Sequence, residues 1–106
     1  MAKKVLGQLA CAATTNETIY TVPSSKSAVV STLAVCNRSA SAVTYRIAIR
    51  PAGATLANQH YIVYDASLPA NSRDYLTLGI TLATTDVVAF YASAASLSVS
   101  LFGDES

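Results

Sequence analysis

The side chains that could act as acids, bases or nucleophiles are few in this chain and are not grouped. His60 is its single histidine, and a general base needs a proton donor or nucleophile held within hydrogen-bond reach. No serine occupies a Gly-x-Ser-x-Gly elbow. We therefore expect no enzymatic activity, and we place His60 in a strand at an edge or an interface. The carboxylates fall mostly in turns and near the chain end, where they cap turns and aid solubility: Glu17, Asp65, Asp74, Asp86, Asp104 and Glu105.

The sequence contains no pattern of a metal or cofactor site. Cys11 and Cys36 are the two cysteines, and together with His60 they lack the spacing of metal ligands. The four glycines include no phosphate-binding loop. Without an export signal, both cysteines are expected to be reduced and buried. A Cys11–Cys36 disulfide between neighbouring strands is the alternative.

The N-terminal segment MAKKVLGQLACAA superficially resembles a signal peptide. Its apolar run is short, and Gly7 and Gln8 interrupt it. We therefore expect residues 4–12 to form a first strand. No apolar run approaches the ~20 residues of a transmembrane helix, so we expect no membrane partner.

The composition favours a protein whose surface is covered by neighbours. Charged residues make up 12% of the chain and hydrophobic residues 52%, with many Ala, Ser and Thr. Such a surface has little self-repulsion and low side-chain entropy, although a merely bland soluble surface is the alternative. The net charge is +1 and the cations are scattered. Arg46 and Arg50 share a strand face, but two arginines do not form a nucleic-acid groove, so nucleic acid is not an expected partner.

Period-two alternation and turn residues predict an all-β chain of about eight strands. A chain of 106 residues forms one domain, residues 1–106. The spacing of the turns predicts a single small antiparallel β-sandwich, of jelly-roll or immunoglobulin-like topology. Residues 51–58 form the longest loop, with room for one helical turn, and residues 103–106 form a polar tail. The expected strands are 4–12, 18–22, 28–36, 43–50, 60–64, 74–82, 86–92 and 96–101.

Alternation also predicts which side chains face the core. The segments 28–36 and 86–92 are apolar on both faces, which predicts that each lies inside its sheet. Gly79 suits a bulge or a bend where a strand changes sheet. The sets expected to share a face are Val5, Leu9 and Cys11; Val29, Leu33 and Val35; Val30, Ala34 and Cys36; Val43, Tyr45, Ile47 and Ile49, opposite Thr44, Arg46 and Arg50; and Leu97, Val99 and Leu101.

The six tyrosines are the feature most suggestive of binding, because exposed tyrosine can stack on sugars or anchor an interface. Tyr45 lies on an apolar strand face and is expected in the core. Tyr61, Tyr64, Tyr75 and Tyr91 fit either packing or an exposed platform. Packing in the core or between subunits is the preferred interpretation, since the chain has no tryptophan.

Six runs, taken in order, resemble a group of small virion structural proteins of tailed bacteriophages. The resemblance covers nearly the whole chain. It implies a small β-sandwich attached to a capsid or a tail, and it transfers no catalytic residue. The runs are Val35–Ser39 (VCNRS), Tyr45–Gly53 (YRIAIRPAG), His60–Asp65 (HYIVYD), Leu78–Leu82 (LGITL), Asp86–Ala92 (DVVAFYA) and Leu101–Gly103 (LFG).

The resulting prediction is a non-enzymatic virion subunit, assembled in the bacterial cytoplasm, that decorates or cements a capsid through protein contacts. Its expected partners are other virion proteins, either the major capsid protein or tail components, and copies of itself in a homo-oligomer. The alternative is a tail, collar, baseplate or fibre-attachment subunit. A further alternative is a glycan-binding module for host adsorption, which predicts exposed tyrosines clustered on one face or loop set.

Overall fold

The computed structural model describes residues 2–106, which form eight antiparallel strands and two short 3₁₀ turns. The all-β prediction is confirmed. The long loop was expected to contain one helical turn, and it contains two, η1 and η2. The last strand continues through Asp104 to Glu105, so most of the expected polar tail is part of a sheet. The elements are β1 (Ala2–Ala10), β2 (Glu17–Thr21), β3 (Ala28–Asn37), β4 (Val43–Arg50), η1 (Pro51–Gly53), η2 (Asn58–His60), β5 (Tyr61–Leu68), β6 (Arg73–Leu82), β7 (Val87–Ala92) and β8 (Leu97–Glu105).

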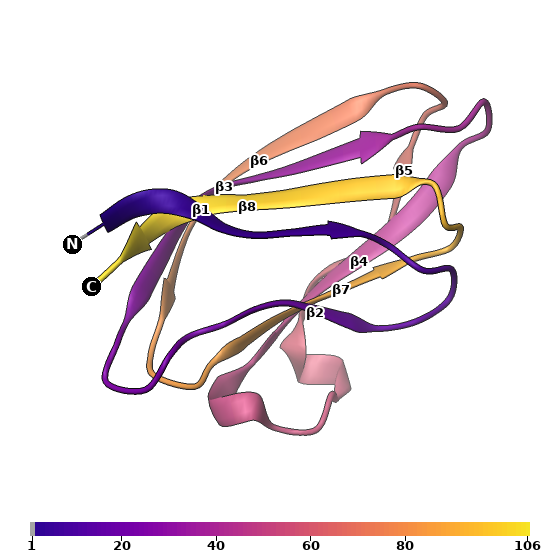
Figure 1. Ribbon diagram of the computed structural model, residues 1–106. Helices are drawn as coiled ribbons and strands as arrows, with labels where there is room; N and C mark the ends of the chain where they lie inside the picture. The colour runs from indigo at the N-terminus through magenta and orange to yellow at the C-terminus, as the bar shows by residue number, and fades with distance from the viewer. Residues whose placement is uncertain (1) are drawn as a thin grey trace.

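The strands form two four-stranded sheets that pack face to face (Figure 1). Sheet A has the order β1-β8-β3-β6 and sheet B the order β2-β7-β4-β5. Four strand pairs follow the pattern of one long hairpin whose turn lies between β4 and β5 and which is wrapped into two sheets. These pairs are β1–β8, β2–β7, β3–β6 and β4–β5. This is the jelly-roll topology. The predicted β-sandwich is therefore confirmed, in the jelly-roll form, with β3 and β7 inside their sheets as expected.

The core lies between the two sheets and follows the predicted alternation in β4 and β8. Val43, Tyr45 and Ile47 are buried, and Ile49 packs against the core from its edge. The Tyr45 ring stacks on Phe90, with 5.6 Å between the ring centroids. Its hydroxyl donates to the carboxylate of Asp74 over 3.0 Å. The predicted inward set of the last strand is also buried: Leu97, Val99 and Leu101.

The alternation predicted for β3 is wrong in its first half, because a β-bulge interrupts the strand. Val29 is 41% exposed, whereas Val30 is fully buried. Val30 pairs with Gly103 and Thr32 with Phe102, so Ser31 is an extra residue that reverses the side-chain phase. Leu33 and Val35 therefore do face the core, as expected. Across from this bulge, β6 has its own irregularity at Gly79 (φ +61°), which confirms the bulge predicted there.

A second bulge corrects the face predicted for β1. Val5 pairs with Phe102 and Gly7 with Leu101, so Leu6 is the extra residue. Val5 consequently points outward and is 47% exposed, while Leu6 and Leu9 pack against the core. A Cβ on Gly7 would lie 2.4 Å from the carbonyl oxygen of Ile19, so a glycine is required where β1 approaches sheet B.

The two cysteines are both free, but only Cys11 is buried as predicted. Cys36 is exposed because it alternates with the buried residues Val35 and Asn37 and so lies on the outer face of sheet A. The disulfide alternative is excluded in this fold, since β8 lies between β1 and β3. Burial, with a smaller contribution from Glu17, raises the pKa of the Cys11 thiol to about 11.

Iodoacetamide should therefore label one thiol in the native protein and two after denaturation. Cys36 is exposed to the reagent, whereas Cys11 is buried and its raised pKa disfavours the reactive thiolate. Mass spectrometry of the alkylated chain measures the stoichiometry, and Cys36→Ser should remove the native label entirely. Rapid native labelling of Cys11 would contradict this assignment.

Asn37, at the end of β3, is the one buried polar residue in the described chain. Its amide nitrogen donates to the carbonyl oxygens of Ser41 (2.9 Å), Leu68 (3.2 Å) and Pro69 (3.1 Å). Its amide oxygen accepts from the backbone and hydroxyl of Ser39, both at 3.0 Å. One side chain thus joins the β3–β4 turn to the β5–β6 turn.

Glu105, at the opposite end of the sandwich, joins the two sheets. Its carboxylate accepts from the Tyr20 hydroxyl of β2 (2.5 Å) and from the Lys4 ammonium of β1 (2.9 Å). Both donors favour the charged form, so they lower the pKa of Glu105 below its usual value, the tyrosine contributing most.

This pair of contacts predicts a loss of stability in acid. A carboxyl group whose pKa is lower in the folded state stabilises the fold above its unfolded pKa, and this contribution disappears as the pH falls below about 5. The melting temperature of the native protein should fall between about pH 5 and pH 3 more steeply than that of Glu105→Gln. The melting temperatures are measured by differential scanning calorimetry. If they depend on pH in the same way for both proteins, Glu105 does not contribute to the loss of stability in acid.

Candidate interaction surfaces

The residues considered first for chemistry have structural roles. His60 is not in a strand: it ends η2, immediately before β5, and its Nδ1 accepts a hydrogen bond from the backbone N–H of Ala57 over 3.1 Å. Within residues 2–106, no three His, Cys, Asp or Glu side chains are grouped so that they could hold a metal ion. Exposed apolar and aromatic side chains lie on the outer faces of both sheets.

The outer face of sheet A has an apolar patch formed by Val5, Val29 and Phe102. Directly paired residues point to the same side of a sheet, and Val5 pairs with Phe102 while Asp104 pairs with both Lys3 and Val29. Val5 and Val29 are exposed and Phe102 is partly buried. The bulges in β1 and β3 place both valines on this face, where the simple alternation had placed them inward. We call these three residues the sheet A patch.

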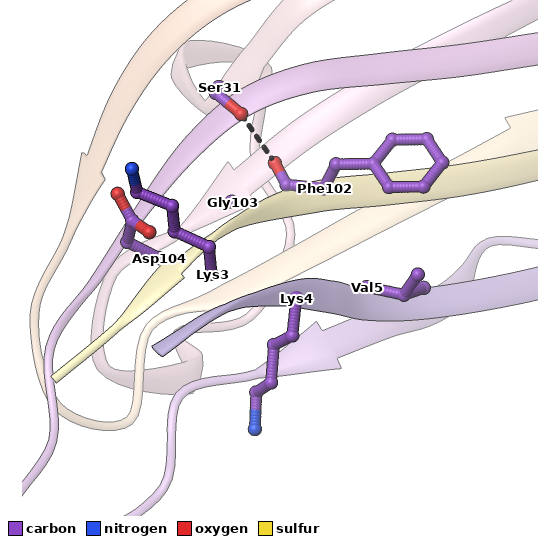
Figure 2. Close-up of a pocket in the computed structure, with 7 residues that line it drawn as sticks. All are labelled: Lys3, Lys4, Val5, Ser31, Phe102, Gly103 and Asp104. Atoms are coloured by element: carbon purple, nitrogen blue, oxygen red, sulfur yellow. Dashed lines mark hydrogen bonds between the residues drawn. The ribbon is translucent and has the colours of Figure 1, made fainter. Parts of the chain in front are cut away.

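A shallow depression of about 490 Å³ adjoins the sheet A patch (Figure 2). The Ser31 hydroxyl donates to the carbonyl oxygen of Phe102 over 3.2 Å and closes one side. Figure 2 shows Lys3 and Asp104 together at one edge, while the Lys4 side chain points away. The depression is lined by Lys3, Lys4, Val5, Ser31, Phe102, Gly103 and Asp104.

The outer face of sheet B has a cluster of aromatic rings around Arg46. The guanidinium carbon lies 4.2 Å from the ring centroid of Tyr64 and 4.4 Å from that of Tyr91. Asp65 accepts from its Nε (2.6 Å) and from its terminal nitrogen (3.3 Å). This hydrogen-bonded carboxylate raises the pKa of Arg46 further. Tyr61 meets Tyr64 edge to face, with centroids 5.0 Å apart. These five residues are the Arg46 cluster.

Two bulges in the edge strand β5 assemble the Arg46 cluster. Tyr45 pairs with Ala66 and Ile47 with Val63, so both Tyr64 and Asp65 lie opposite the single residue Arg46. Asp65 has a φ of +53°, in the left-handed region. Ala48 then pairs with Tyr61, which leaves Ile62 as a second extra residue. In a regular strand, Tyr61 and Tyr64 would point to opposite faces because they are three residues apart. The bulge at Ile62 brings them onto one face.

The loop of residues 51–60 borders this cluster. Arg50 holds the loop by donating from Nε to the carbonyl oxygen of Ala54 (2.6 Å) and from a terminal nitrogen to that of Gly53 (3.1 Å). A recess of about 310 Å³ remains between the loop and β5, lined by Asn58, Tyr61 and Tyr64.

The four tyrosines left open by the sequence therefore separate into two groups. Three of them, Tyr61, Tyr64 and Tyr91, gather on sheet B, whereas Tyr75 lies alone on β6 of sheet A with Arg73 5.7 Å from its ring centroid. Sequence reasoning placed Arg46 outward but missed the roles of Asp65 and Asn58. The register of β5, which is set by pairing with β4, reveals the role of Asp65, and the fold of the loop before β5 places Asn58.

The two arginine side chains on sheet B already bind other groups of the same chain. Arg46 is paired with Asp65 and Arg50 with backbone carbonyl oxygens. The two arginines that share this face are therefore not a free cationic pair. In residues 2–106, no helix has the length and hydropathy needed to span a membrane.

Comparisons with known proteins add no assignment to this geometry. No family model matches the chain, and no curated protein or solved structure matches it significantly.

Proposed function

We propose that this chain is a non-enzymatic structural subunit of a tailed-bacteriophage virion, and that it decorates or cements the capsid. The sequence resemblance supports this role, as do the low content of charged residues and the jelly-roll sandwich. The observation that carries the proposal is the sheet A patch, where Val5 and Val29 are 47% and 41% exposed. Its partners are the major capsid protein and further copies of the chain.

The rest of sheet A suits a flat contact. Several of its outward positions are small or short polar residues, which lose little side-chain entropy when a partner covers them. The exposed Arg73 and Tyr75 of β6 lie on the same face. The apolar patch supplies the part of such a contact that gains most from losing water. A subunit present in many copies can use a modest interface, since ~1,600 Å² of well-packed contact is enough for stable association. The outward residues include Gln8, Ala34, Thr77, Thr81, Ser98 and Ser100.

Copy number in purified particles tests the role. Quantitative mass spectrometry against the major capsid protein should give about one chain per capsid subunit or per capsomer. A few copies per particle would instead support the tail, collar, baseplate or fibre-attachment alternative. Absence from the particle would overturn both.

A pair of matched variants tests the surface. Val5→Asp and Val29→Asp place a charge in the sheet A patch and should reduce incorporation into particles about tenfold or more, because each puts an unpaired charge into the contact. Ile62→Asp is the control, since it makes the same change at a 48% exposed position on sheet B. Equal melting temperatures establish that all three variants fold. Loss of incorporation by Ile62→Asp alone would assign the contact to sheet B.

A further inference from the structure

The recess beside the Arg46 cluster is a shallow, open depression of about 310 Å³ with mostly aromatic walls. Tyr64 as a residue is 59% exposed, and the ring of Tyr61 stands at 84° to its ring. Asn58 adds an exposed amide at the rim. The recess thus offers an aromatic floor, an aromatic wall and a polar edge.

The exposed Tyr64 ring is held in place before any ligand arrives. Arg46 lies against its face, and Arg46 itself is fixed between Tyr64 and Tyr91 and by two hydrogen bonds to Asp65. Binding to a ring that is already ordered costs little conformational entropy. A large aromatic surface that is both rigid and open to solvent is a feature of binding sites.

The site has no charge to offer an anion or a cation. The guanidinium of Arg46 is paired with Asp65 over 2.6 Å, and the residues that line the recess include no Lys, Arg, Asp or Glu. A phosphate group or an acidic peptide would have to displace Asp65. The ligand that fits is therefore neutral.

The hydrogen-bonding groups at the edge remain available. Within residues 2–106, the Asn58 amide and the hydroxyls of Tyr61, Tyr64 and Tyr91 make no hydrogen bond to another side chain or backbone group. A neutral ligand with a flat apolar face and hydroxyl groups around it satisfies both the ring and these polar groups. A pyranose sugar has that chemistry, because its axial C–H bonds form an apolar face and its hydroxyls project from the rim.

We propose that the recess formed by Asn58, Tyr61 and Tyr64 binds a neutral sugar ring of a glycan, stacked on Tyr64, with Arg46 as the residue that positions this tyrosine. The site lies on sheet B and is separate from the sheet A patch, so it does not depend on the proposed virion contact. A particle held together through sheet A would display the recess outward.

Nuclear magnetic resonance titration of the purified chain tests the proposal. The probes are neutral tetrasaccharides of glucose, galactose, mannose and N-acetylglucosamine, with tetragalacturonate as the acidic comparison. At least one neutral probe should give saturable shifts confined to Arg46, Asn58 to Asp65 and Tyr91, with no dependence on salt. Tetragalacturonate should give none.

Two tyrosine variants distinguish binding at this site from nonspecific binding to exposed tyrosines. Tyr64→Ala should weaken binding about tenfold or more, as expected when an aromatic anchor is truncated. Tyr75→Ala should leave it unchanged, because Tyr75 is a 64% exposed tyrosine on the other sheet. Both residues are exposed, so both variants should fold.

The outcomes that overturn the proposal are specific. These are the absence of saturable shifts with every neutral probe, full binding by Tyr64→Ala, or tighter binding of the acidic probe. Reduced incorporation of Tyr64→Ala into particles would instead identify the Arg46 cluster as a protein contact. The proposed virion role fails independently, if the chain is absent from purified particles.

Discussion

Replacing Asn37 by aspartate is expected to lower the free energy of unfolding by at least ~3 kcal/mol. The amide nitrogen of Asn37 donates to three backbone carbonyl oxygens, of Ser41, Leu68 and Pro69. Aspartate has the same shape but no donor when ionised. It would leave three acceptors without their partner and would bury a negative charge against them, at a position that is 1% exposed.

The matched control is Asn16→Asp, which makes the same change in an exposed turn. Chemical denaturation followed by circular dichroism should show a large decrease in the free energy of unfolding for Asn37→Asp. The same free energy should change by no more than about 0.5 kcal/mol for Asn16→Asp. The loss should shrink in acid, where the new carboxyl group is protonated and can donate one hydrogen bond. Equal stability of the two variants at neutral pH would show that the hydrogen bonds of Asn37 do not hold the two turns together.

Ile47→Ala should destabilise the protein by ~2–5 kcal/mol, because it removes buried methyl and methylene groups and leaves a cavity. Ile47 is fully buried in the middle of β4, where it pairs with Val63 of β5 and Phe90 of β7. Leu33→Ala, on the facing sheet, should cost a similar amount, since Leu33 is also fully buried.

Arg38→Ala provides the comparison for these core variants. Arg38 is exposed, and its guanidinium makes one long hydrogen bond to the carbonyl oxygen of Ala95 (3.4 Å). Its loss should change stability little. Thermal unfolding measures the difference, at about 4–8 °C per kcal/mol for a domain of this size. A shift for Arg38→Ala as large as that for Ile47→Ala would contradict the assignment of faces.

Sequence patterns predicted the β-sandwich and the faces of its most regular strands. Alternation in β4 and β8 placed Tyr45, Ile47 and Val99 correctly, because no bulge interrupts the pairing of β4 with β7, and Leu97–Leu101 is a regular part of β8. The jelly-roll order required the structure. Neither periodicity nor turn residues specify which strands become neighbours across the two sheets.

Most of the errors come from bulges that strand pairing creates. Val5 and Val29 were placed inward by strict alternation, and one extra residue in each strand turns them outward. Cys36 was misplaced for a different reason, because it alternates with the buried Val35 and so lies on the outer face. In β5 a bulge has the opposite effect: it brings Tyr61 and Tyr64, which alternation would separate, onto one face. Gly79 was the one bulge that its residue type signalled.

Both candidate surfaces depend on these irregularities. Without the bulges in β1 and β3, Val5 and Val29 would not lie beside Phe102 on the outer face of sheet A. Without those in β5, the ring of Tyr61 would not meet that of Tyr64. The same local defects that limit prediction from sequence thus create the features on which the two proposals rest.

The pairing of β1 with β8 also determines the order in which the chain can fold. Ala2 pairs with Glu105, and β8 lies between β1 and β3 in sheet A. Until a ribosome has released the last strand, β1 has no neighbour in its sheet and β3 has only β6. Long-range pairing of this kind slows folding. Until β8 forms, β1 and one edge of β3 therefore remain unpaired, and such exposed edges favour association between unfolded chains.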